Sequence, residues 1–112
     1  MATLQGKKND EGKPPIGLIP RSALIEEARV LAYGAKKYDL HNWRKGMDHS
    51  RLTDAALRHI LAYIDGEDND PETGISHLAH ARCSLGFLIE YQQKKLGKDD
   101  RYGAAQVPAR KR

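Results

Sequence analysis

The residues best suited to chemistry lie between Arg58 and Ala81, in the stretch RHILAYIDGEDNDPETGISHLAHA. Imidazoles and carboxylates stand there on both sides of one acidic turn: His59, Glu67, Asp68, Asp70, Glu72, His77 and His80. Carboxylates bind hard cations such as Mg²⁺, whereas imidazoles ligate metals, contact phosphate or transfer protons. The combination predicts a site for a cation, a phosphate group or both.

Three carboxylates are the first candidates for holding a cation. Glu67 and Asp70 have ExxD spacing, which places both on one side if the turn is helical. Glu27 lies in an earlier helix and could add a ligand from a second segment. The alternative for Glu26 and Glu27 is a favourable interaction with the helix dipole, which we prefer for Glu26 and leave open for Glu27. The turn itself could be a polar loop capped by Asp70. It lacks the DxDxDG spacing of a calcium-binding EF-hand, which is therefore excluded.

The histidines form a second group. His77 and His80 are three residues apart on one helical face, and His59 comes from the preceding antiparallel helix. A structural zinc site is not favoured because no suitable thiolate accompanies them. Contact with a metal or phosphate, acid–base chemistry and hydrogen bonding inside the core all remain open.

The connection AKKYDLHNWRKGMDH carries groups that suit a nucleotide, since cations meet phosphates and aromatic rings stack on bases. With the arginine before His59, these candidates are Lys36, Lys37, Tyr38, Asn42, Trp43 and Arg58. The alternative is that Trp43 and Tyr38 plug the open end of the core. Arg58 could instead pair with Asp54 one helical turn earlier.

The elements that position these residues are helices. Ser22 is expected to cap a helix that bends or frays near Gly34, and Ser50 to cap one ending at Asp65-Gly66. Pro71 suits a first helical position, and the last helix is expected from about Ser76 to Leu96. No segment shows a long alternation of period two, so the predicted fold is all-α.

The predicted architecture is a compact antiparallel bundle whose small core is completed by oligomerisation, as a dimer or tetramer. Residues 21–97 form the helical domain. Residues 1–20, rich in glycine and proline, form a flexible arm, and residues 98–112 form a basic, flexible tail.

Composition narrows the possible classes of function. The 112 residues are 30% charged, with a net charge of +4, and the mean hydropathy is −0.71. No apolar run is long enough for a membrane span, and the first residues lack the apolar core of a signal peptide. The lone Cys83 precludes a disulfide framework, and its apolar surroundings predict an inert thiol in a reducing cytoplasm. The positive charge gathers at the two ends, so nucleic-acid binding is not favoured as the main function.

Four blocks of the sequence carry a resemblance to a known family: GAKKYDLHNW, RHILAYIDGED, DPETG and HLAHARCSLGFLIEY. Together, from about Pro15 to Tyr91, they resemble the N-terminal domain of phage and bacterial dATP/dGTP diphosphohydrolases. That group is similar to the all-α, MazG-like nucleotide pyrophosphohydrolases.

The resemblance implies hydrolysis of a purine deoxynucleoside triphosphate to its monophosphate and pyrophosphate, with Mg²⁺ or Mn²⁺ held by helical carboxylates. It implies Glu27 and His59 as catalytic candidates and, as metal ligands, Glu27, Glu67, Asp70, His77 and His80. The substrate candidates are those of the connection and Arg58.

One departure from the MazG-like pattern concerns the metal ligands. Those enzymes show an EExxE helix followed by an ExxD helix, whereas here Val30 stands at the third glutamate position and Glu67 and Asp70 fall at a turn. Either histidines replace carboxylates, or the surrounding residues differ, or activity is weak. The alternative function is a non-enzymatic phage accessory protein that binds nucleotide or nucleic acid through the basic connection.

Overall fold

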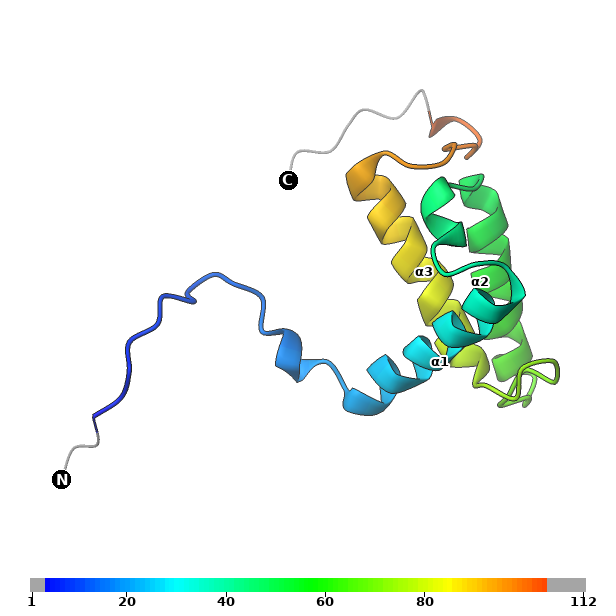
Figure 1. Ribbon diagram of the computed structural model, residues 1–112. Helices are drawn as coiled ribbons and strands as arrows, with labels where there is room; N and C mark the ends of the chain where they lie inside the picture. The colour runs from blue at the N-terminus through cyan, green and yellow to red at the C-terminus, as the bar shows by residue number, and fades with distance from the viewer. Residues whose placement is uncertain (1–3, 105–112) are drawn as a thin grey trace.

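A computed structural model describes residues 4–104, and all regular elements in this part of the chain are helices (Figure 1). The α-helices are α1 (Arg21–Lys37), α2 (His49–Ile64) and α3 (His77–Lys94). Two short 3₁₀ helices, η1 (Ile16–Leu18) and η2 (Asn42–Lys45), precede α1 and α2. The prediction of an all-α fold is confirmed.

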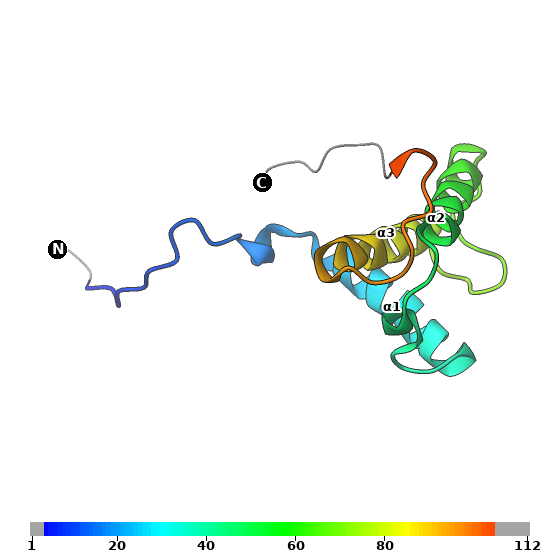
Figure 2. The same ribbon diagram turned by 90° about the horizontal axis from the view of Figure 1, so that it is seen from above.

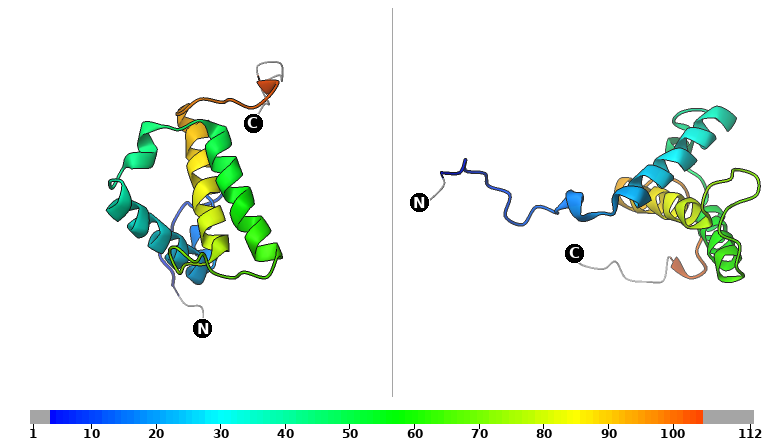
Figure 3. Two further views of the ribbon diagram at one scale, coloured as in Figure 1. Left: turned by 90° about the vertical axis from the view of Figure 1, so that its right-hand side faces the viewer. Right: turned by 90° about the horizontal axis from the view of Figure 1, so that it is seen from below.

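Helix α3 lies between the other two helices and packs against both. Figure 3 shows α2 and α3 side by side and antiparallel, with α1 crossing on the other side of α3. The buried apolar residues come almost entirely from the α2–α3 hairpin: Leu52, Ala56, Ile75, Ala79, Ala81, Cys83 and Tyr91. The alanines let the two helix axes approach closely.

Helix α1 continues through Gly34 to Lys37, so the predicted bend or fraying near Gly34 was wrong. The amide of Tyr38 donates to the carbonyl of Gly34, which extends the helical ladder past the glycine. A glycine inside a helix costs only about 1 kcal/mol, which neighbouring hydrogen bonds can offset. The extra turn matters because it carries Lys37.

The helix starts agree with the sequence at one of three places. Ser76 caps α3, and its side chain accepts a hydrogen bond from the amide of Leu78. Ser22 and Ser50 were expected as caps, but α1 is preceded by Pro20 and α2 by Asp48. Each of these serines is the second residue of its helix.

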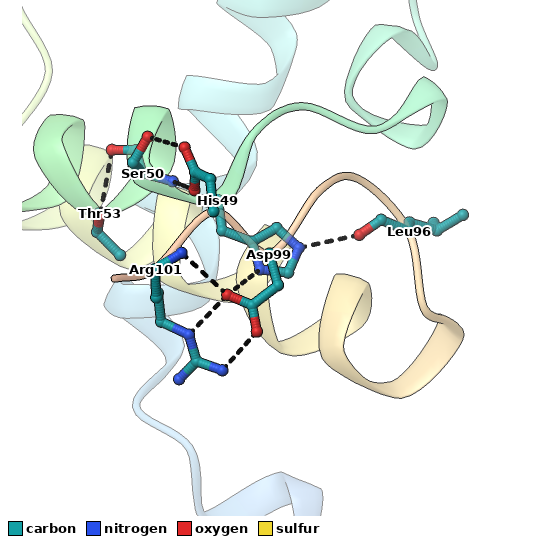
Figure 4. A network of polar contacts seen from close by, with 7 residues as sticks. His49, Ser50, Thr53, Leu96, Asp99 and Arg101 are labelled. Carbon is teal, nitrogen blue, oxygen red and sulfur yellow. Dashed lines mark hydrogen bonds and ion pairs between the residues drawn. The ribbon is translucent and has the colours of Figure 1, made fainter. Parts of the chain in front are cut away.

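The start of α2 is bound instead by the segment that follows α3 (Figure 4). Asp100 accepts hydrogen bonds from the amide and the hydroxyl of Ser50. The His49 side chain lies 3.0 Å from the carbonyl oxygen of Leu96. Asp99, near the His49 ring, pairs with Arg101. Lys98, Asp99 and Asp100, which were expected to belong to a flexible tail, thus contact the helical domain, while tail residues 105–112 lie outside the described range.

The end of α3 is set by a close backbone crossing. Lys95 takes a left-handed conformation with φ of 57°, and the helix ends at Lys94, two residues before the predicted Leu96. Gly46 has φ of +91°, and a Cβ on it would lie 2.7 Å from the amide nitrogen of Gly97. Only glycine allows the connection before α2 to approach the segment after α3 this closely.

The turn between α2 and α3 is not helical, so the expectation of Pro71 at a first helical position was wrong. An isolated bridge joins Asn69 to Ser76, and the amide of Asp70 donates to the carbonyl of Ile75. These bonds close a compact loop and fix Asp70 where the two ends of the loop meet.

The first described residues extend away from the helices (Figure 2). Residues 4–20 are exposed and contain η1, while residues 1–3 of the predicted arm lie outside the described range. Within residues 4–104, no helix combines the length and the apolar composition that crossing a bilayer demands.

Candidate functional site

The histidines of α2 and α3 meet at the end of the hairpin nearest the turn. The Nδ1 atoms of His59 and His77 are 2.8 Å apart, and the ring of His80 stacks on that of His59 at 4.5 Å. The structure thus brings these three candidate residues together. His77 is the one buried polar residue within the described range, at 4% exposure.

The orientation of His77 is fixed by a carboxylate. Its Nε2 lies 2.6 Å from Oε1 of Glu67, which directs Nδ1 toward His59. A carboxylate on the far nitrogen is the arrangement that commonly orients a metal-ligating histidine. Glu67 therefore lies behind His77, where it serves as a partner of the imidazole.

Asp70 completes the group. Its Oδ1 accepts hydrogen bonds from the amides of Glu72 and Thr73, and its Oδ2 faces His59 Nδ1 at 4.0 Å. Donor atoms of His59, Asp70 and His77 all lie within 4.8 Å of one another. Two imidazole nitrogens and one carboxylate oxygen at this spacing fit a divalent metal ion after small side-chain shifts.

The protonation states suit such an ion. Burial lowers the pKa of His59, with further lowering by His80 and His77, and burial also lowers the pKa of His80. Burial by itself raises the pKa of Asp70, but the amides of Thr73 and Glu72 outweigh it and the pKa falls. These shifts favour the neutral imidazole of His59 and the ionised carboxylate of Asp70 near neutral pH, the forms that bind metals.

A cavity of about 750 Å³ opens beside this group, between α1, the connection through η2 and the α2–α3 hairpin. Its volume is in the range of small-molecule sites. Eight of the predicted site residues line it: Lys37, Tyr38, Asn42, Trp43, Arg58, His59, Asp70 and His80. The structure therefore brings most substrate candidates to the same place as the metal candidates.

The turn is joined to α1 through Glu72, across one side of the cavity. Glu72 Oε1 accepts hydrogen bonds from the Tyr33 hydroxyl at 3.1 Å and from Lys37 Nζ at 3.2 Å. The Lys37 and Tyr33 donors lower the pKa of Glu72. This contact sets the distance between Lys37 and Asp70, which face the same cavity.

The two aromatic candidates differ in their surroundings. The ring of Trp43 stacks on Phe87 at 4.5 Å, and the guanidinium of Arg44 lies 4.3 Å from its centroid. These contacts favour the packing role that the sequence left open for Trp43. Tyr38 is 63% exposed at the cavity edge, so its ring is the more accessible surface for a base.

Arg58 is exposed at the cavity and forms no ion pair among residues 4–104, Asp54 included. Its guanidinium is therefore available for phosphate. Arg51 lies two helical turns earlier on the same side of α2 and also lines the cavity. Lys36 is exposed but is not part of the lining.

Glu27 is not brought to the histidines. It forms an ion pair of 2.6 Å with Arg82 of α3, and it lies outside the cavity lining. This pair joins α1 to α3. Its assignment as a catalytic base and metal ligand remains a prediction, for which this geometry offers no support.

The lining residues absent from the predicted set include three with polar side chains that face the site, Tyr33, Arg51 and Thr73. Helical spacing contained a signal for two of them, because Tyr33 is four residues before Lys37 and Arg51 is seven before Arg58. The hydroxyl oxygen of Thr73 lies 2.7 Å from Nε2 of His80. The loop conformation creates this contact, and no sequence pattern predicts it.

Cys83 is buried and borders the cavity. Burial raises the pKa of its thiol to about 12. A thiol with this pKa is almost entirely protonated at neutral pH, in agreement with the predicted inertness.

Comparison with known proteins agrees with the resemblance in the sequence. A family model described as "dATP/dGTP diphosphohydrolase, N-terminal" matches residues 3–101. The chain is 42% identical over 105 residues to a Salmonella phage PMBT28 protein named dATP/dGTP diphosphohydrolase. That match covers 94% of this chain but 36% of the phage protein, so the chain spans about a third of the length of this relative. No solved structure matches the chain significantly.

Proposed function

The chain belongs to the dATP/dGTP diphosphohydrolase N-terminal family, and from this premise we propose that it hydrolyses purine deoxynucleoside triphosphates. The products would be the monophosphate and pyrophosphate, and the reaction would require a divalent metal ion, Mg²⁺ or Mn²⁺. The observation that carries the proposal is the single cavity shared by the imidazole–carboxylate group, the cationic side chains and an exposed aromatic ring.

Asp70 would hold the metal ion together with phosphate oxygens of the substrate, and the ion would neutralise the polyphosphate and lower the pKa of bound water. Arg58 and Lys37 would bind phosphate oxygens, because both reach the same cavity from opposite sides. Tyr38 would stack on the purine at the cavity edge. His80 has a lowered pKa and lies beside the metal candidates, so it is placed to accept a proton from the attacking water.

The decisive experiment is a screen of nucleoside triphosphates with identification of the products. We expect dGTP and dATP to give monophosphate and pyrophosphate with Mg²⁺ or Mn²⁺, and no turnover after chelation. Nucleoside plus triphosphate would indicate a different bond cleavage. Binding of nucleotide or nucleic acid without turnover under any divalent metal would support the accessory-protein alternative.

Arg58→Ala tests the phosphate contact. Loss of a charged hydrogen bond to phosphate should lower kcat/KM by about 10- to 100-fold, which corresponds to about 1.5–3 kcal/mol. Lys13→Ala, in the exposed segment before α1, is the matched control for removal of one positive charge. Equal losses in both variants would mean that general electrostatic attraction, and not a specific contact, explains the role of Arg58.

A further inference from the structure

We propose that His59 Nδ1, His77 Nδ1 and Asp70 Oδ2 form a two-histidine, one-carboxylate centre that binds a first-row transition metal before nucleotide and in preference to Mg²⁺. The inference deepens the proposed function and rests on it for the role of the metal. It replaces the carboxylate-rich Mg²⁺ site that the family resemblance implies with one whose ligands are mainly nitrogen.

The chemistry of the donors points to the class of metal. Mg²⁺ binds oxygen ligands and retains several waters, so two imidazoles are poor ligands for it. Imidazole nitrogen suits iron, cobalt, nickel and zinc, and two histidines with one carboxylate leave further coordination positions open. Those open positions would face the cavity, which His59 and Asp70 both line.

Geometry supports the two nitrogens as ligands to one ion. Adjacent ligands of a metal with bonds of about 2.1 Å lie about 3 Å apart in octahedral geometry. The two Nδ1 atoms are 2.8 Å apart, close to this separation. Without metal, two Nδ1 atoms at this distance form a hydrogen bond in which one imidazole N–H donates to the other ring. Metal binding would replace that hydrogen bond.

Each ligand is also held from behind. Glu67 fixes Nε2 of His77 at 2.6 Å, and His80 stacks on His59 at 4.5 Å. In Asp70, Oδ1 is occupied by two backbone amides, which leaves Oδ2 directed toward the histidines. Side chains pre-positioned in this way lose little conformational freedom when a metal binds.

The test uses the whole chain, stripped with a chelator and titrated with CoCl₂, MnCl₂ or MgCl₂ alone. We expect one Co²⁺ per chain, with a d–d absorption band typical of nitrogen and oxygen ligands, and affinity for Co²⁺ at least 100-fold above that for Mg²⁺. Bound Mn²⁺ should show electron spin-echo modulation from imidazole nitrogen. Equal affinity for Mg²⁺ and Co²⁺, or no nitrogen coupling, would overturn the proposal.

Variants locate the site. His59→Asn and Asp70→Asn should each weaken Co²⁺ binding by at least about tenfold, while His41→Asn, at an exposed histidine that does not line the cavity, should leave it unchanged. Circular dichroism checks that each variant folds, and the Asp70→Asn side chain can still accept the two amide hydrogen bonds. Unchanged Co²⁺ binding in both folded site variants would show that the metal binds elsewhere.

The outcomes separate this inference from the proposed function. Tight Co²⁺ binding at these residues without turnover of any nucleotide would support the metal centre and contradict the hydrolase. Turnover with Mg²⁺ in a chain that binds no transition metal by itself would support the hydrolase and contradict the metal centre.

Discussion

At the scale of single residues, the hydrogen-bond partners of His77 both satisfy its buried ring and orient it toward the other candidate ligands. It is 4% exposed, and both ring nitrogens have partners, Glu67 on one side and His59 on the other. A buried imidazole without partners would cost a few kcal/mol, so these contacts are needed for folding. They also direct one lone pair toward the cavity side of the hairpin, where His59 and Asp70 lie.

Glu67→Ala should therefore weaken metal binding without removing a ligand. Loss of the carboxylate behind a ligating histidine typically costs 10- to 100-fold in affinity, and we expect a reduction of this size for Co²⁺. Isothermal titration calorimetry measures it, and Glu11→Ala, an exposed acid before α1, controls for the loss of one negative charge. A complete loss of binding in Glu67→Ala would indicate direct ligation by Glu67.

The thiol of Cys83 gives a prediction with a defined pH dependence. Burial raises its pKa from the ordinary 9.0 to about 12. At pH 8, native protein should react with iodoacetamide about a thousandfold more slowly than unfolded protein, as measured by mass spectrometry.

The same shift affects stability. Because the folded pKa is the higher one, the folded state binds more protons between the two values. The free energy of unfolding should be unaffected by this thiol below about pH 9 and should decrease as pH rises toward 12. Cys83→Ala removes this contribution, so a wild-type advantage over Cys83→Ala that grew above pH 9 would contradict the assignment.

At the scale of elements, the start of α2 is stabilised by a distant segment. Asp100 binds both the amide and the hydroxyl of Ser50 at the positive end of the helix, where a carboxylate is favourable. This contact joins the segment after α3 to the helix that carries Arg58 and His59. The cavity wall therefore depends on residues beyond the last helix.

Asp100→Ala should lower the free energy of unfolding by about 1 kcal/mol, the usual cost of losing a helix cap. Urea denaturation followed by circular dichroism measures it. Asp10→Ala, in the exposed segment before α1, is the control and should change stability by less than about 0.5 kcal/mol. Equal stability of the two variants would mean that solvent replaces Asp100 at the helix start.

Substitution of two glycines by alanine should change the stability of the fold in opposite directions. Gly97 has φ of +68°, and a Cβ there would collide with the backbone of Met47. Gly97→Ala should destabilise the fold by more than about 1 kcal/mol. Gly34 lies inside α1 with no atom within 4 Å of the added carbon, so Gly34→Ala should stabilise by about 0.5–1 kcal/mol. Thermal unfolding of the pair measures both signs, and a stable Gly97→Ala would contradict the close crossing.

At the scale of the whole molecule, the three helices leave much apolar surface exposed. No residue of α1 is buried. On α2, Leu57, Leu61 and Ile64 are exposed by 55%, 57% and 68%, at spacings that place them on one side of the helix. Exposed apolar stripes of this kind favour association. The dimer or tetramer, which was expected from the small core, remains a prediction.

Leu61→Lys should shift such an oligomer toward monomer, because it places a charge in the centre of the stripe. Sedimentation equilibrium at micromolar concentration measures the change. Leu4→Lys, at a leucine that is 97% exposed and far from the helices, should leave the assembly unchanged. A wild-type chain that is monomeric throughout would remove the need for a partner copy.

The sequence by itself determined the helical class and the hairpin, and it supplied the candidate site residues. Helical spacing placed His77 and His80 on one face, and a polar turn between two apolar stripes implied that His59 would face them. These features depend on neighbours within one or two helical turns, where local geometry is nearly independent of the rest of the chain.

Tertiary structure alone decided which of these residues meet. Glu27 pairs with Arg82, Trp43 stacks on Phe87, and Asp70 turns one oxygen toward His59 because its other oxygen binds the loop backbone. Each outcome depends on loop conformation and helix crossing, which arise from close packing between distant segments. Such packing has no periodic signature in the sequence, because it is set by the summed shapes and hydrogen-bond requirements of many side chains.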